Sequence, residues 1–237
     1  MKKITSSLLA IFLVFCVSAS ALANNDDLTS EVYTDEITGE EILAVYEVDE
    51  NGNFIEVSFE EYEAEMDKTA NSTKKNDNPT SPKPDFTLFP YDFYGYEFLY
   101  ESFSQYYEGP RMVAQGISCN GAQPCPISAT QQTTVTETFT ANLGIDSTQK
   151  KAALKAGAGY SISTAKSNQT SQTLYIPVGE RAYLGFKPKL NKWVGDLNYF
   201  HQQGVSRTIV STETATVTAP LIDGTGNAAG YFLLVRY

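Results

Sequence analysis

Residues 133–164 read TTVTETFTANLGIDSTQKKAALKAGAGYSIST and alternate hydroxyl-bearing with apolar side chains in two runs. In the first run, every second residue is a threonine, and the positions between the threonines are apolar except Glu137. A period of two residues is typical of a β-strand with one buried face. The stretch therefore predicts an amphipathic β-hairpin. Its apolar column would consist of Val135, Phe139, Leu143 and Ile145 in the first run and Tyr160 and Ile162 in the second.

Strand signals on both sides of this hairpin extend the β prediction to the rest of the domain. Short runs of β-branched and aromatic residues alternate with glycine, proline and asparagine, which is typical of an antiparallel all-β domain. We therefore expect a β-sandwich. One helix is expected inside it, at residues 147–155, with Gly157 at its C-terminal end. The expected strands are residues 111–118, 133–145, 160–166, 170–176, 181–188, 208–219 and 231–236.

The apolar column of residues 133–164 can be buried in two ways. In a sandwich it packs on the core, and the threonines face water with their strand preference intact. In a membrane the same column faces lipid, where a carboxylate at Glu137 is costly. The connection between the two runs also carries three lysines, which would have to cross the bilayer. These charges favour the core.

The first 23 residues have the pattern of a secretory signal peptide. Two lysines precede an apolar run, and an Ala-x-Ala cleavage site ends at Ala23. We therefore expect a secreted, extracellular protein cleaved near Ala23. Cleavage removes Cys16 and leaves Cys119 and Cys125, which are expected to form a disulfide in an oxidising compartment.

The net charge of −11 is concentrated in the N-terminal part of the chain. Residues 24–67 contain 16 acidic and no basic residues, whereas residues 86–237 contain 10 acidic and 11 basic residues. Nucleic-acid binding needs a basic stripe, and this sequence has none. We therefore expect no nucleic-acid partner.

The chain divides into four segments by composition. Residues 1–23 are the signal peptide, and residues 24–67 form an acidic module that is a candidate pro-segment. A turn signal at Asn51-Gly52 and a capping box that begins at Ser58 predict a small hairpin followed by a helix in that module. A polar, proline-rich stretch, residues 68–84, predicts a disordered linker. The remainder, residues 85–237, is the all-β domain.

Aromatic residues fill 11 of the 22 positions in residues 86–107. Tyr94, Tyr96 and Tyr100 alternate on one face of a strand predicted within residues 91–107. This face is either a surface for ligands such as glycans or a filled sandwich core. A pair of carboxylates could make the protein glycan-active, although their spacing supports no particular pair. The candidates are Asp92, Glu97, Glu101 and Glu137.

The sequence lacks the residue patterns of most enzyme classes. The chain has a single histidine, His201, and no nucleophile elbow. A zinc site needs several histidine or cysteine ligands. We therefore expect no catalytic residues, no metal and no cofactor.

Two resemblances bear on function. The order of a Thr/Ser-rich strand, a glycine-containing turn, a Ser/Thr-rich strand and Ile176-Pro177-Val178-Gly179 resembles the central β-region of aerolysin-like pore-forming proteins, over residues 128–190. That resemblance implies that the hairpin at residues 133–164 inserts into membranes. The stretches EVDENGNFIEVSFEEYE and YIPVGERAYLGFKPK resemble small secreted β-proteins of Gram-positive bacteria. This second resemblance implies a fold and no activity.

These observations lead to three expectations for function. The first is a non-enzymatic β-domain protein that binds an extracellular protein or an envelope or matrix component, through the aromatic strand or the loop at residues 221–230. The second is an aerolysin-like pore-forming protein with an inserting hairpin at residues 133–164, in which case the membrane is also a partner. The third is a glycan-binding or glycan-active protein that uses residues 91–107.

Overall fold

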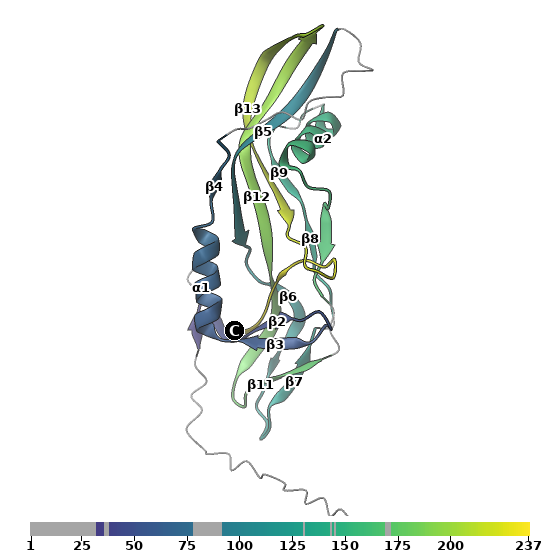
Figure 1. Cartoon of the computed structure of the whole chain (residues 1–237). Helices are drawn as coiled ribbons and strands as arrows, with labels where there is room; N and C mark the ends of the chain where they lie inside the picture. Colours follow the sequence, from purple (N-terminus) through teal and green to yellow (C-terminus); the bar gives the residue numbers. More distant parts are fainter. Residues whose placement is uncertain are drawn as a thin grey trace, which may run out of the picture. The chain divides into compact units, whose positions relative to one another are not determined.

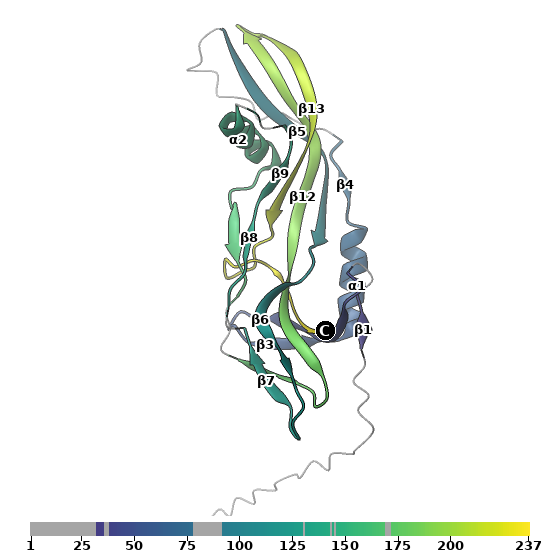
Figure 2. The same cartoon turned by 180° about the vertical axis from the view of Figure 1, so that it is seen from behind.

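The computed structural model is an antiparallel β-structure with two helices in its described part (Figures 1 and 2), which confirms the predicted all-β, sandwich-like fold. The described residues belong to one compact unit, Glu31–Tyr237. The predicted signal peptide lies outside them. The structure describes residues 32–35, 38–77, 92–129, 131–142, 144, 146–168 and 172–237.

One strand, β12 (Arg181–Gln203), organises the fold. At about 3.3 Å per residue, its 23 residues span roughly 75 Å. Its first part, through Pro188, pairs with one set of strands, and its second part pairs with another. We call these parts, with their partners, the sandwich half and the long-sheet half. The first set is β14 (Gly230–Arg236) and β6 (Arg111–Ser118), and the second is β5 (Asp92–Tyr107) and β13 (Ser206–Pro220).

The sandwich half has a two-layer core. A small sheet of β7 (Cys125–Ser128) and β11 (Thr173–Ile176) packs its apolar residues against the larger sheet. Because side chains alternate between the two faces of a strand, every second side chain of these strands points into this core. The buried residues that meet there include Val113, Ile127, Leu174, Ile176, Leu184, Phe186, Phe232 and Leu234.

The N-terminal segment forms the predicted hairpin and helix; the hairpin belongs to this half, and the helix packs against both the hairpin and β5. Ser58 caps the helix in a complete capping box with Glu61. The first strand of the hairpin, β2, pairs with β14. It is buried on both faces, because Leu43 and Ala44 join one core cluster while Ile42 and Val45 join another. The elements are β1 (Tyr33–Thr34), β2 (Glu41–Val48), β3 (Phe54–Val57) and α1 (Phe59–Ala70).

Defined structure continues past residue 67, after which a disordered linker was predicted. The helix α1 continues to Ala70, and β4 (Lys74–Lys75) pairs with β5. Residues 68–77 therefore have defined structure, because the amphipathic helix and the edge of β5 supply partners for their backbone. The rest of the predicted linker, residues 78–84, lies outside the described residues.

We call residues 134–166 the flap; its elements β9 and α2 pack against the long-sheet half (Figure 1). The prediction of one continuous strand at 133–145 was wrong, since the strand is broken at Glu137. The second predicted strand begins only at Thr164, and the predicted helix extends to Ala158, followed by Gly159 in the left-handed conformation at φ 71°. The flap elements are β8 (Thr134–Thr136), β9 (Thr138–Thr140), α2 (Ser147–Ala158) and β10 (Thr164–Lys166).

Candidate functional site

The surface beneath the flap is an apolar stripe on the long sheet. It runs across β5, β12 and β13, because every second residue of each strand faces the same side of the sheet. Two side chains of α2, Leu154 and Ala158, are buried on it four residues apart, as one face of a helix requires. The stripe consists of Phe98 on β5, Trp193 and Leu197 on β12, and Ala215, Val217 and Ala219 on β13.

A glycine lets α2 lie directly on the backbone of β5. A Cβ atom at Gly157 would lie 2.1 Å from the carbonyl oxygen of Phe98, closer than any real contact. Since that oxygen belongs to the backbone of a paired strand, it cannot move aside easily. Any larger residue at this position would therefore lift α2 from the sheet.

The base of the flap is anchored in the sandwich half. Val135 on β8 pairs with Ala165 on β10, and both side chains are buried in the core of that half. The adjacent Ser167 is also buried, and its hydroxyl accepts a hydrogen bond from the backbone N–H of Thr133. The flap is thus fixed at its two ends, while β9 and α2 between them pack on the long sheet.

Polar side chains at the periphery hold the outer part of the flap. The Tyr96 hydroxyl donates to Asp146 at 2.9 Å, and Lys150 pairs with Glu213 on β13 at 2.8 Å. Burial and the Asp146 carboxylate raise the pKa of Tyr96 to about 12. These contacts are partly solvated, and exposed ion pairs contribute about 0–1 kcal/mol each.

Two further contacts join the flap to β12 and β13. The hydroxyl oxygens of Thr138 on β9 and Thr218 on β13 are 2.5 Å apart. The ring of Tyr160 stacks on Trp193, with 5.3 Å between centroids and 16° between planes. Because the chain contains one tryptophan, Trp193 is a specific optical reporter of flap position.

Glu137 holds the two arms of the flap together. Its carboxylate pairs with Lys155 at 2.9 Å and accepts from the Tyr160 hydroxyl at 2.8 Å, and its backbone N–H donates to the carbonyl of Ser163. Burial acts to raise the pKa of Glu137, but the hydrogen bonds from Lys155, Tyr160 and Ser163 outweigh it, so the pKa lies below its ordinary value. The charge that is costly in lipid is therefore stabilised in the closed flap.

The structure does not place the predicted apolar column on one surface. Val135 lies in the sandwich core, whereas Phe139 and Tyr160 pack at the edge of the stripe. Ile162 is exposed. The other two members of the column, Leu143 and Ile145, lie outside the described residues.

The predicted aromatic surface is only partly formed by the residues named from the sequence. Tyr94 and Tyr96 lie beyond α2 on the same face as the flap, while Tyr100 packs against the apolar stripe. Sequence reasoning missed Tyr199 and His201, which the register of β12 places beside them. Tyr94 stacks on His201 at 4.3 Å and on Tyr199 at 5.5 Å, so both of its ring faces are already covered.

The comparison with known families identifies the group to which the chain belongs. The model of a family of unknown function, DUF6060, matches residues 92–232. The chain is a DUF6060 protein. The match includes β5, β12, β13 and the flap and begins after β4. No curated protein and no solved structure matches the chain.

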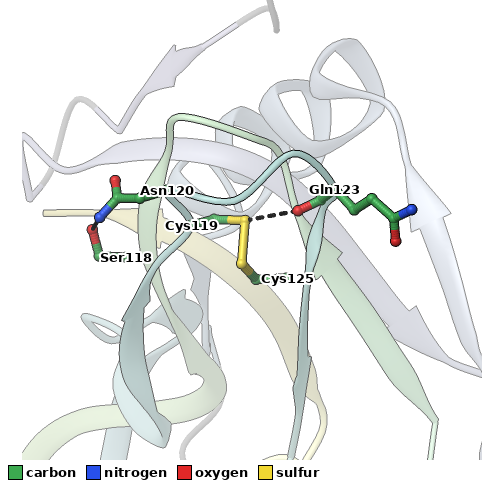
Figure 3. Close-up of a disulfide and its surroundings, with 5 residues drawn as sticks. All are labelled: Ser118, Cys119, Asn120, Gln123 and Cys125. Atoms are coloured by element: carbon green, nitrogen blue, oxygen red, sulfur yellow. Dashed lines mark hydrogen bonds between the residues drawn. A yellow bond between two sulfur atoms is a disulfide. The ribbon is translucent and has the colours of Figure 1, made fainter.

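The predicted disulfide of this DUF6060 protein is confirmed. Cys119 follows β6 and Cys125 begins β7, with their Cα atoms 5.5 Å apart (Figure 3). The sulfur of Cys119 lies 3.4 Å from the carbonyl oxygen of Gln123, and Cys119 is fully buried. The bond therefore ties the two layers of the sandwich half together at one edge.

The loop at residues 221–230, expected as a contact surface, braces the end of the flap. The Asn168 amide donates to Asp223, and the backbone N–H of Ala228 donates to the carbonyl of Lys166. Burial acts to raise the pKa of Asp223, but hydrogen bonds from Thr225, Asn227 and Asn168 lower it below its ordinary value. The loop thus has a structural role next to β10.

Two searches of the described residues concern metals and membranes. No group of three or more His, Cys, Asp or Glu side chains in this part of the chain could hold a metal ion. No helix among the same residues is long and apolar enough to cross a bilayer.

Proposed function

We propose that this protein is exported and acts on membranes, and that the flap opens, extends into an amphipathic β-hairpin and enters the bilayer. The observation that carries this proposal is a conflict between sequence pattern and conformation. Residues 134–142 and 154–162 alternate with the period of a strand, yet the structure holds them as short strands, a helix and a connection without regular structure.

The second arm shows the conflict most clearly. Leu154, Ala156, Ala158, Tyr160 and Ile162 are apolar at every second position, while the residues between them are Lys155, Gly157, Gly159, Ser161 and Ser163. Leu154 and Ala158 also satisfy the helical spacing of α2. A segment whose sequence fits both a strand period and a helix period can adopt either conformation. Here the strand pattern of the sequence and the packing that holds α2 as a helix favour different structures.

The flap also has the length that insertion requires. Its two arms, residues 133–145 and 154–166, have 13 residues each, or about 43 Å when extended. This exceeds the roughly 30 Å hydrocarbon thickness of a bilayer. The alternation would place toward lipid one face that is apolar except for Glu137, and toward water one hydroxyl-rich face.

The position of the acidic segment favours the flap as the moving part. Ile42 and Val45 of β2 are buried in the core, so cleavage of the linker would leave residues 24–67 attached through the sheet. Release of the flap would leave no gap inside a sheet, because the flap covers the long sheet largely through side chains. The pro-segment hypothesis is therefore not needed for this proposal.

Export and pore formation draw support from further features of the chain. The first 23 residues have the pattern of a signal peptide, and the disulfide fits an oxidising compartment. The sequence resemblance of residues 128–190 to aerolysin-like pore-forming proteins favours membrane insertion, and the resemblance to small secreted proteins of Gram-positive bacteria favours export alone. The binding of an extracellular protein or of an envelope or matrix component stays a prediction from the sequence.

A reversible lock on the flap tests the proposal. Thr138 and Thr218 face each other in the β9–β13 pair, so the double variant T138C/T218C should form a disulfide that holds the flap closed. We expect the oxidised variant to release no calcein from vesicles and to recover wild-type release after reduction. Release would be measured at neutral pH and after acidification.

The controls separate the lock from other effects of reduction. Wild-type protein with and without reductant controls for loss of the native disulfide, and each single cysteine variant controls for the substitutions. Equal release by the oxidised and reduced double variant would refute the role of the flap. No release from wild-type protein under either condition would refute pore formation.

A further inference from the structure

The free end of the long sheet exposes apolar side chains at a hairpin turn. Strands β12 and β13 are joined by Gly204, with φ at 57°, and Val205, whose side chain is fully exposed. Ile209 and Val210 follow on β13 and are about half exposed. A β-bulge opposite Tyr199 and Phe200 inserts Val210 as an extra residue beside Ile209.

Tyrosine rings lie at the same end of the sheet, on the face opposite to the one that the register gives Ile209. Tyr94 is 55% exposed and stacks between Tyr199 and His201. Because the ring faces contact each other, the column presents ring edges and hydroxyls to solvent. Such a column offers no flat face to a sugar, whereas an apolar ring with a polar edge suits the interface of a membrane.

The charged groups at this end are paired. His201 Nε2 lies 2.5 Å from Asp92, and Arg207 pairs with Glu97 at 2.6 Å while its guanidinium stacks 3.6 Å above the ring of Phe200. No cationic cluster for anionic lipid headgroups is present among these residues. Any attraction to a surface must therefore come from apolar and aromatic contact.

We propose that this end, formed by Tyr94, Tyr199, Val205, Ile209 and Val210, docks into the interface of a lipid bilayer, including one made of neutral lipid. The flap covers, nearer the middle of the strands, the face that bears Tyr94 and Tyr199, so docking would bring the flap to the membrane before it opens. The biological role of this step rests on the proposed membrane activity, but docking itself is measured without pore formation.

Two valines at opposite ends of β12 provide a matched test. Val205 lies in the turn after β12, and Val178 lies in the turn before it with its side chain 49% exposed. The full exported protein and its V205D and V178D variants would be floated with phosphatidylcholine vesicles. We expect V205D to lower the partition coefficient at least tenfold, V178D to leave it within twofold of wild type, and added salt to have little effect.

Several outcomes would overturn the proposal. Wild-type protein that does not float with phosphatidylcholine vesicles, equal losses for V205D and V178D, or full binding by V205D would each do so. Binding that needs anionic lipid and disappears with salt would also contradict it. Thermal unfolding of each variant shows that a loss of binding is not a loss of fold.

The test also separates docking from flap opening. Vesicle binding without calcein release supports the docking end and refutes the pore. Calcein release that V205D does not reduce refutes the docking end and leaves the pore standing. Trp193 fluorescence reports flap position independently, because Trp193 lies under Tyr160 and far along β12 from Val205.

Discussion

The two halves of β12 bury apolar surface by different means. In the sandwich half, paired strands surround β12 and a second sheet covers its face, so backbone ladders and side chains depend on one another. In the long-sheet half, one face is covered by a flap that pairs with the sheet over only three residues, at Thr216–Thr218 of β13. Opening the first arrangement would require unfolding, whereas the proposed opening of the flap would leave the strands beneath it paired.

The electrostatic contacts follow the same division. The sandwich half contains a buried ion pair between Lys187 and Asp35. The hydroxyl of Tyr62 also donates a hydrogen bond to the Asp35 carboxylate. The flap is held by partly solvated groups such as Lys150 and Lys155. A buried charge that loses its partner is costly, while a solvated one recovers most of its energy from water.

The largest effect is expected from breaking the buried pair. Lys187→Met leaves the carboxylate of Asp35 buried without its cation, and such changes cost about 3–5 kcal/mol. We expect the free energy of unfolding to fall by this amount, as measured by chemical denaturation. The double variant K187M/D35N removes both charges and should recover most of the loss; a double variant as unstable as the single one would contradict this explanation.

A second change should act on the flap alone. Gly157→Ala places a Cβ against the carbonyl oxygen of Phe98, and forced overpacking of this kind costs about 1–3 kcal/mol. Because α2 can lift away, we expect the cost to appear as flap opening, seen as greater quenching of Trp193 fluorescence by iodide. The sandwich half should unfold at the wild-type denaturant concentration.

The matched control for this prediction lies on the same helix. Ala152 is exposed on α2, so Ala152→Ser should change neither quenching nor unfolding. If G157A destabilised the whole protein without exposing Trp193, the two halves would not be separable.

Local pattern was enough to predict much of the sandwich half. The strand at residues 111–118 and the capping box at Ser58 are confirmed, because alternation and capping are local properties. The extension of β12 beyond Pro188 was missed. Lys192, Asp196 and Asn198 alternate there with apolar residues, but Val194 and Phe200 place apolar side chains on the same face as these polar ones, and both faces of that part of the strand are partly covered.

The candidate site was harder to predict for a related reason. The helix predicted at residues 147–155 is confirmed, but packing on the apolar stripe and the close approach at Gly157 extend it to Ala158, where the strand period had predicted part of a hairpin arm. The neighbours of Tyr94 depend on the register of β12, which no local pattern reveals. The conformation of the flap and the neighbours of Tyr94 therefore depend on contacts between residues far apart in the sequence, which the pattern of one segment does not reveal.

The disulfide should have a moderate effect confined to the sandwich half. Cys119 and Cys125 close a short loop, and loops of this size give about 2 kcal/mol of stabilisation. We expect the double variant C119S/C125S to unfold at a lower denaturant concentration by this amount. Iodide quenching of Trp193 should stay at the wild-type value, and a rise in quenching would show that the two halves are coupled.

The smallest expected effect concerns the pH dependence of the flap. The pKa of Glu137 is lowered in the closed flap relative to a released one, so its contribution is fully present above the ordinary carboxyl pKa near 4.5 and is lost as the pH falls through the lowered value. Acid should therefore open the flap and raise Trp193 quenching. Glu137→Gln removes this titration at a cost of about 1 kcal/mol, the size of one hydrogen bond. The variant should show higher quenching at neutral pH and a flatter profile in acid; a profile as steep as that of wild type would assign the transition to another carboxylate.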